Sequence, residues 1–289
     1  MNRYAKFVFG LTLSLGFIFV GCNNSKDKVS SNKSTNTFGR IIEKNEINVG
    51  YFIFEPTIMT NPDTGKLEGV FIDMFEEITK SINPTIKINY LPTTLATFHT
   101  ELNSKKFDIC IGATFATPKR SAVVTFSHPL FYCGYTGITK KENAENYDSW
   151  ERVDNPDVKV AVLQGSAISD LVRVEFENQK NIVSYSGSDL TLPLAAVGSD
   201  QADIGLMNQI TVFTYLREHP QLVEVLGNDP LATTYFSWSV RQDDLVWLNF
   251  INTSIDYMIN SGKMYRFEKE YGVPLMHDKK EYFFPLTDK

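Results

Sequence analysis

The chain has 289 residues, with 28 basic and 34 acidic side chains and a formal net charge of −6 at pH 7. A negative balance of this size argues against the basic surfaces that bind nucleic acid or anionic lipid. The sequence holds three cysteines and four histidines, and their spacings match no known metal site. We therefore expect no nucleic-acid partner, no metal and no cofactor.

The N-terminus has the pattern of an export signal. Two basic residues precede an apolar run of 14 residues, Phe7 to Val20, which is shorter than a membrane-spanning helix. The run ends in residues 19–22, FVGC, which are similar to a bacterial lipobox except at Phe19, where that motif has leucine. We expect residues 1–21 to be a lipoprotein signal peptide and Cys22 to be acylated.

Residues 22–38 consist mainly of Asn, Ser, Lys and Thr and contain very few apolar side chains. Such a segment cannot bury enough apolar surface to offset the entropy lost on ordering, which predicts a flexible tether. No later segment is apolar enough to span a bilayer. The expected location is the outer, extracytoplasmic face of a cell membrane, through a lipid anchor. Without the leader the chain has 26 basic and 34 acidic side chains, a net charge of −8.

From residue 39 onwards, strand and helix patterns alternate in two series separated by a polar stretch at 140–157. The expected strands are 47–52, 85–91, 107–113, 158–163, 182–185 and 202–207. The expected helices lie near 71–82, 95–104, 166–176 and 190–197. This alternation predicts an α/β fold with mostly parallel sheets and helices on both faces.

Two further strands, near 134–140 and 235–240, are expected to cross between two lobes and to form a two-strand hinge. Lobe 1 would comprise 39–137 and 236–289, and lobe 2 would comprise 138–235. A long apolar helix follows the second crossing, and Asp243 and Asp244 before it suit a helix N-terminus.

The stretch from Phe107 to Arg120 carries the most functional information. A short apolar strand leads into a small-residue loop, and Thr117 and Pro118 then suit the N-cap and first position of a helix. Arg120 follows at once. Its guanidinium is planar and permanently charged, and it offers paired donors that match a carboxylate.

This stretch, followed by residues 126–130 (FSHPL), resembles the "D-aaa-G-T-x-T-P-E-R … F-S-D-P-Y" pattern of the extracellular solute-binding proteins of family 3, the polar amino acid receptors of ABC importers. Residues 247–272 are similar to the C-terminal pattern of that family, so the resemblance covers 39 to about 274. It implies a Venus-flytrap of the periplasmic binding protein type 2 fold, a small carboxylate ligand, an ABC transporter permease as partner, and a monomer.

The resemblance also implies which residues of lobe 1 bind the ligand. Phe54 stands where the family has an aromatic residue that covers the ligand, and Arg120 stands where the family has the carboxylate clamp. Family members usually have Ser or Thr five residues before that arginine, and this chain has Phe115 there. Thr114 is adjacent, and in a regular extended strand its side chain would point away from the side chain of Phe115.

In lobe 2, residues 163–167 (LQGSA) look like the family's "Q-G-T-T" turn, which closes on the same carboxylate. Ser166 keeps one hydroxyl, and Ala167 lacks the other. Asn208 stands where the family has an aspartate that receives the α-ammonium group of an amino acid. An ammonium ion buried without a compensating charge costs several kcal/mol. The sequence therefore predicts a cleft that keeps a carboxylate clamp without requiring an α-amine, unless Glu55 supplies the negative charge.

Three functions remain open on the sequence. The first is a lipoprotein that captures a small carboxylate for an importer, and the second is a receptor that reports its ligand to another membrane protein. The third is an enzyme, since the same fold carries cyclohexadienyl dehydratase activity. That chemistry needs a general acid, for which Glu55 is the one candidate near the cleft, and we expect no catalytic residues. Whether Cys110 and Cys133 form a disulfide also stays open.

Overall fold

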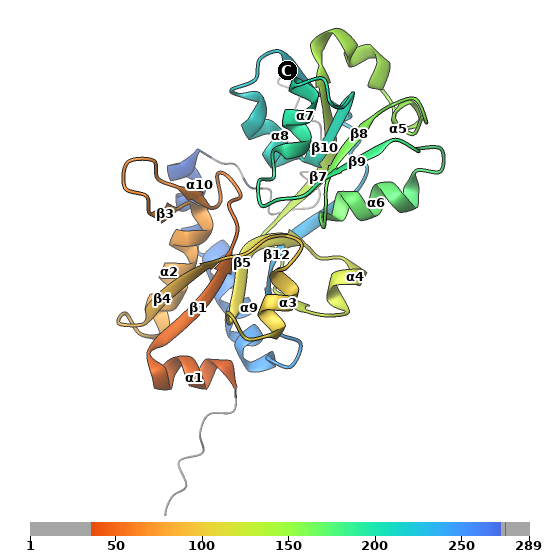
Figure 1. Ribbon diagram of the computed structural model, residues 1–289. Coiled ribbons are helices and arrows are strands. Elements are labelled where there is room, and N and C mark those ends of the chain that lie inside the picture. The colour runs from red at the N-terminus through yellow and green to blue at the C-terminus, as the bar shows by residue number, and fades with distance from the viewer. Residues whose placement is uncertain (1–35, 273–274, 276–289) are drawn as a thin grey trace, which may run out of the picture. The chain divides into compact units, whose positions relative to one another are not determined.

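Alternating strands and helices make up the computed structural model, which describes residues 36–272 and 275 (Figure 1). The expected signal peptide 1–21, the lipidation residue Cys22 and most of the expected tether lie outside the described residues. Among the residues that are described, no helix has the length and apolar character needed to cross a bilayer.

The first group of strands pairs in parallel in the order β4-β1-β5. Its strands are β1 Glu46–Tyr51, β4 Lys87–Pro92 and β5 Ile109–Phe115, and its connecting helices are α2 Val70–Ile82 and α3 Phe98–Asn103. Residue 50 of β1 must be glycine, because a Cβ there would lie 2.7 Å from the ring of Phe107. The βαβαβ series predicted from the sequence is confirmed.

A small hairpin lies between β1 and α2. It consists of β2 Met59–Thr60 and β3 Leu67–Glu68. The side chain of Asn61 accepts hydrogen bonds from the backbone N–H groups of Asp63 (3.0 Å) and Thr64 (2.9 Å), which closes the turn between the two strands.

The second group of strands also pairs in parallel, in the order β10-β8-β9. Its strands are β8 Val160–Leu163, β9 Ile182–Tyr185 and β10 Ile204–Asn208, and its helices are α6 Ala167–Glu175, α7 Leu192–Gly198 and α8 Gln209–Leu216. The polar stretch before this group forms η1 Lys141–Tyr147 and α5 Trp150–Val153. The second series of strands and helices therefore also follows the sequence prediction, and α8 is an addition to it.

Two antiparallel strands, β7 Phe131–Lys140 and β12 Thr233–Val240, join the two groups. The first part of β7 pairs with β12, and its remaining residues pair with β10 and with β11 Leu222–Val225. The other edge of β12 pairs with β5, and the last residues of β12 pair with β6 Thr125–Phe126 on the edge opposite β5. The parallel groups are thus the ends of one continuous hydrogen-bonded sheet, and the two strands predicted to cross are its middle.

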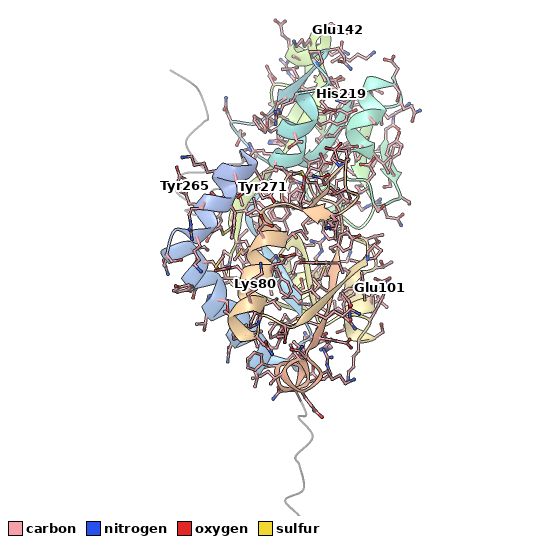
Figure 2. All side chains as sticks on the ribbon, turned by 90° about the vertical axis from the view of Figure 1, so that its left-hand side faces the viewer. Lys80, Glu101, Glu142, His219, Tyr265 and Tyr271 are labelled. Atoms are coloured by element: carbon pink, nitrogen blue, oxygen red, sulfur yellow. The ribbon has the colours of Figure 1, made fainter. Side chains whose placement is uncertain are left out.

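The chain returns to the first group through α9 Leu245–Asn260 and α10 Lys263–Tyr271. Helix α10 packs against α2, and the hydroxyl of Tyr271 donates a 2.8 Å hydrogen bond to Asp73 of α2 (Figure 2). The buried face of α9 carries Trp247, Ile251 and Ile255, whose spacing is that of one side of a helix.

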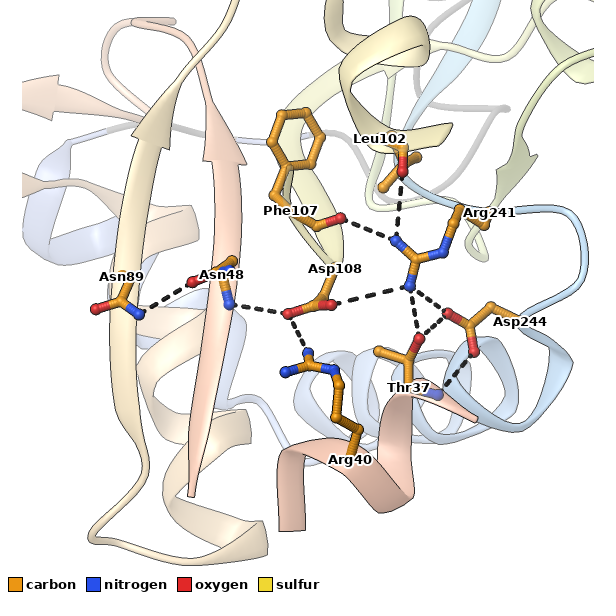
Figure 3. A network of polar contacts seen from close by, with 9 residues as sticks. All are labelled: Thr37, Arg40, Asn48, Asn89, Leu102, Phe107, Asp108, Arg241 and Asp244. Carbon is orange, nitrogen blue, oxygen red and sulfur yellow. Dashed lines mark hydrogen bonds and ion pairs between the residues drawn. The ribbon is translucent and has the colours of Figure 1, made fainter. Parts of the chain in front are cut away.

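The first helix, α1 Thr37–Lys44, includes the last two residues of the expected tether, 37 and 38. A buried polar network holds it in place (Figure 3). The side chain of Asp108, which precedes β5, lies 2.5 Å from the guanidinium of Arg40 and 3.8 Å from that of Arg241. Arg241 also pairs with Asp244 at 2.9 Å and donates to the hydroxyl of Thr37 at 2.6 Å.

Asp244 also takes part in this network. The residue is the N-cap of α9, as the sequence predicted for a helix N-terminus, and its side chain makes no capping hydrogen bond to that helix. It pairs with Arg241 and also accepts a hydrogen bond from the hydroxyl of Thr37. A buried guanidinium needs a carboxylate more than an exposed helix end does.

Cys110 and Cys133 are both buried and unpaired, and burial raises the pKa of each thiol to about 12.

Replacing Arg241 with alanine should lower the free energy of unfolding by about 3–5 kcal/mol, because it leaves Asp244 buried without its cationic partner. Urea denaturation of wild type and variant measures this change. Lys80→Ala is the control, since Lys80 is 60% exposed and faces Glu76 one helical turn away (Figure 2). That exposed pair should contribute less than about 1 kcal/mol. Equal losses in the two variants would contradict the stabilising role of the network.

Candidate functional site

A small cavity of ≈ 20 Å³ lies at the carboxyl ends of β1, β5, β8 and β10. In sheets of this kind, side chains that follow parallel strands meet at one edge. All seven ligand-binding residues expected from the sequence line it: Phe54, Thr114, Phe115, Arg120, Ser166, Ala167 and Asn208. The structure adds six residues that the sequence analysis did not single out: Phe52, Leu95, Tyr135, Leu190, Met207 and Phe236.

The backbone around Arg120 is fixed by a helix cap. Thr117 is the N-cap of α4 Pro118–Ser121, and its side chain accepts a hydrogen bond from the backbone N–H of Arg120 at 3.3 Å. The guanidinium then donates to two carbonyl oxygens, that of Phe115 at 2.9 Å and that of Gly165 at 2.8 Å. It also lies 5.8 Å from the centre of the Phe98 ring. One side chain therefore links the first group of strands to the turn that precedes α6.

The charge of Arg120 is not balanced by a carboxylate. Within the part of the chain that the structure describes, no Asp or Glu lies in ion-pair contact with it. Burial lowers the pKa of the guanidinium, although arginine stays protonated in proteins. Two of its five N–H groups donate to the carbonyls of Phe115 and Gly165, and the others remain able to receive an anion.

Both Thr114 and Phe115 line the cavity, which differs from the alternation expected of a regular strand. The cause is an irregular register between β5 and β12. Ser237 pairs with Thr114 and Ser239 pairs with Cys110, so β5 has three residues where β12 has one. Such a bulge changes the direction of the side chains that follow it. The hydroxyl of Thr114 is buried and has no hydrogen-bond partner among the described residues.

Aromatic rings form one wall of the cavity. Phe236 of β12 stacks on Phe54 with ring centres 5.3 Å apart, and Phe115 lies 4.1 Å from Phe236 and 4.4 Å from Tyr135. Phe54 is 1% exposed, so it belongs to the core and lines the cavity at once. The wall surrounds the guanidinium with apolar surface, which strengthens electrostatic interactions inside the cavity.

Tyr135 of β7 is the polar residue that the sequence analysis missed. It is 2% exposed, and burial raises the pKa of its hydroxyl well above the usual value. The positive charge of Arg120 and a hydrogen bond from the backbone N–H of Ile168 offset part of that rise. The signal available in the sequence was its position on a strand expected to cross between the lobes, where side chains face the cleft.

Ser166 and Asn208 use their polar groups within their own turns. The Ser166 hydroxyl donates to the carbonyl of Leu163 at 2.6 Å and accepts from the N–H of Ser169, as the N-cap of α6. Asn208 is the N-cap of α8, and its Oδ1 accepts from the N–H of Thr211 at 3.0 Å while its Nδ2 donates to the Thr211 hydroxyl at 2.9 Å. Helix capping therefore competes with the ligand contacts expected of these two residues.

A second cavity of ≈ 680 Å³ adjoins the first and shares Phe52, Phe54 and Leu190 with it. We call it the outer cavity and the ≈ 20 Å³ cavity the inner one. Glu55, which the sequence analysis considered as a source of negative charge, lines the outer cavity. His219, labelled in Figure 2, lines it as well.

Close contacts hold the two groups of strands together beside the inner cavity. Gly165 has φ +79°, and a Cβ there would lie 3.0 Å from the Cα of Ala96, which precedes α3. Lys119 of α4 pairs with Asp170 of α6 at 2.7 Å. The turn at Gly165 thus suits glycine for its backbone angle and for the space available.

The sequence matches the family model of the bacterial extracellular solute-binding proteins, family 3, over residues 47–274. The match spans most of the chain, and the fold and the position of the cavity agree with it. The chain belongs to this family.

Individual relatives are distant. The chain is 26% identical over 208 residues to a probable histidine-binding protein of Campylobacter jejuni, covering 72% of this chain and 75% of that protein. It is 21% identical over 220 residues to a cyclohexadienyl dehydratase of Pseudomonas aeruginosa, covering 75% and 80%. A substrate-binding protein of an ABC uptake transporter from Streptococcus pneumoniae, solved with bound histidine, superposes with a TM-score of 0.73 at 19% identity, covering 84% and 99%. This likeness confirms the type 2 periplasmic binding protein fold.

Arg120→Ala should weaken binding of a carboxylate by about 2–4 kcal/mol, because the anion loses the one cationic side chain among the described residues that line this small cavity. Isothermal titration with the acid that gives the largest thermal shift in wild type measures the loss. Arg173→Ala, at an exposed arginine of α6 that lines neither cavity, is the control. If Arg120→Ala binds that acid within about threefold of wild type, Arg120 is not the clamp, since 1.4 kcal/mol corresponds to about tenfold.

Proposed function

We propose that this protein captures a small carboxylate outside the cytoplasm and delivers it to an ABC importer. The observation that carries the proposal is the guanidinium of Arg120, which lies in an apolar cavity with N–H groups available and no carboxylate in contact. A buried cation without a counter-ion favours an anionic ligand, and a guanidinium suits a carboxylate best. Membership in a solute-binding family supports the same role.

The residues that line the inner cavity also indicate whether the ligand requires an α-amine. No Asp or Glu is among the described residues that line it, and the acceptor oxygen of Asn208 is engaged by Thr211. An α-ammonium group placed beside the bound carboxylate would lack a formal negative partner. The ligand that fits is therefore a small acid that does not require an α-amine, even though the Campylobacter relative carries the name of a probable histidine-binding protein.

We propose binding and not catalysis as the function. A dehydratase needs a general acid within hydrogen-bond reach of the leaving group. Glu55, Asp189, Glu218 and His219 line the outer cavity, and no carboxylic acid or imidazole is among the described residues around the inner one, where Arg120 would hold the carboxylate. Delivery to an importer also suits a chain tethered at the membrane through Cys22, because the lipid anchor would keep the protein close to its permease.

Cys22→Ser should release the protein from the membrane fraction or leave it as uncleaved precursor, because a serine cannot receive the thioether-linked lipid. Fractionation followed by mass spectrometry of the N-terminus measures both outcomes. Ser30→Ala, in the same expected tether, is the control and should leave membrane association unchanged. Normal processing and unchanged association of Cys22→Ser would refute lipidation at this residue.

Asn208→Asp should shift preference from an amine-free acid towards the matching amino acid, because it adds the negative charge that an ammonium needs. Aspartate is as good an N-cap as asparagine, so the bond from the N–H of Thr211 should persist. Isothermal titration of both ligands against wild type and variant measures the shift. Asn260→Asp makes the same change at an exposed site outside both cavities.

Wild type should prefer the amine-free acid or bind both compounds. If wild type binds the free amino acid at micromolar affinity and ignores the amine-free acid, the interpretation of Asn208 is wrong. Glu55, Asp189 and Glu218 would then be the carboxylates to replace, since all three line the adjoining cavity.

A further inference from the structure

Two buried residues with hydroxyl groups, Thr114 and Tyr135, line the inner cavity together with Arg120. Thr114 is 1% exposed, and its hydroxyl has no hydrogen-bond partner among the described residues. Tyr135 is 2% exposed, and its phenol O–H can donate to an acceptor placed in the cavity. Buried polar groups are nearly always satisfied, and both residues line the inner cavity. Their arrangement indicates a ligand that brings acceptor oxygens.

The remaining polar side chains of the inner cavity are occupied. Ser166 donates to the carbonyl of Leu163, and Asn208 exchanges two hydrogen bonds with Thr211. Among the described side chains that line the cavity, the polar groups left to meet a ligand are thus the guanidinium of Arg120 and the hydroxyls of Thr114 and Tyr135. Hydroxyls can also accept from an ammonium group, but they are neutral and would leave two positive charges side by side.

The ligand must therefore carry acceptors both at its carboxylate and at the neighbouring carbon. A 2-oxo acid has this pattern, because its ketone oxygen has two lone pairs, no charge and no proton. An α-amino acid presents three donors and a positive charge at the same place. An unsubstituted acid presents only C–H groups there, and would leave the hydroxyls of Thr114 and Tyr135 unsatisfied.

The apolar wall indicates the rest of the molecule. Phe115 and Phe236 line the inner cavity, whose ≈ 20 Å³ corresponds to roughly one water-sized group. A carboxylate with its neighbouring ketone already exceeds that space, so the rest of the ligand must pass Phe54 and Leu190, which belong to both cavities, towards the outer cavity of ≈ 680 Å³. These two side chains are apolar, which favours an aliphatic or aromatic group at that point of the ligand.

We propose that the ligand is a 2-oxo acid with an apolar side chain, whose carboxylate binds Arg120 and whose ketone oxygen accepts hydrogen bonds from Tyr135 and Thr114. This inference rests on the proposed function and names the substrate class of the same site. Tyr135 is then a specificity-determining residue, which distinguishes acids by the atom attached to their second carbon.

The test uses three acids that share one side chain: 4-methyl-2-oxopentanoate, 4-methylpentanoate and L-leucine. Isothermal titration of the mature wild-type protein should rank them in that order, with the oxo acid at least about tenfold tighter than the unsubstituted acid, a difference of about 1.4 kcal/mol. Phenylpyruvate, 3-phenylpropionate and L-phenylalanine form a second set with an aromatic side chain. Binding of neither oxo acid would overturn the proposal.

Tyr135→Phe removes one oxygen and keeps the ring that packs on Phe115. It should reduce the advantage of the oxo acid to less than about threefold and leave the affinity for the unsubstituted acid nearly unchanged. Thr114→Val should act in the same direction. Tyr132→Phe is the matched control, since Tyr132 lies on the same strand and lines neither cavity. An unchanged oxo preference in both site variants would also overturn the proposal.

Arg120→Ala separates this inference from the proposed function. If it abolishes binding of every acid while wild type shows no preference for the oxo acid, the carboxylate receptor stands and the 2-oxo acid does not. If wild type binds the acids and Arg120→Ala binds them equally well, the clamp on which both depend is refuted.

Discussion

The guanidinium of Arg120 donates to a carbonyl at the end of β5 and to the carbonyl of Gly165 before α6, so one side chain connects the two groups of strands. Those two bonds fix the plane of a permanent positive charge and leave its other N–H groups directed elsewhere. The cavity around that charge is apolar and small, so water cannot screen it well. An anion that binds there would be stabilised by the charge of Arg120, at the point where this side chain connects the two groups of strands.

The buried charges before the start of β5 and after its end differ in how they are paired. Before its start, Asp108 lies between Arg40 and Arg241 in a network where each buried charge has a partner (Figure 3). After its end, Arg120 contacts carbonyl oxygens but no carboxylate of the residues that the structure describes. The first arrangement satisfies the requirement that buried ions be paired, and it stabilises the fold. The guanidinium of Arg120 departs from that requirement, and a bound anionic ligand would supply the missing negative charge.

Helix capping divides the polar residues of the cavity into two classes. Ser166 and Asn208 start helices α6 and α8, and their side chains already satisfy backbone N–H groups. Thr114 and Tyr135 lie on strands, where no helix end competes for their hydroxyls. The hydroxyl of Ser166 and the amide of Asn208 are thus engaged within their own turns, and no such cap engages Thr114 or Tyr135. Residue type alone does not determine which case applies, because Ser, Thr and Asn serve both purposes.

The sequence by itself determined the α/β class, both series of strands and helices, and the set of segments that meet at the cavity. The periodicity of apolar residues, the turn residues and helix caps such as Thr117 depend on residues close in sequence, so they can be recognised before the fold is known. Only the tertiary structure revealed Tyr135, because a tyrosine on a crossing strand looks like any other β-strand residue until its neighbours are known. The bulge before Thr114 and the pairing of Asp244 with Arg241 likewise depend on partners distant in sequence or on strand register. Long-range register and the competition for buried hydrogen bonds are decided when the elements pack.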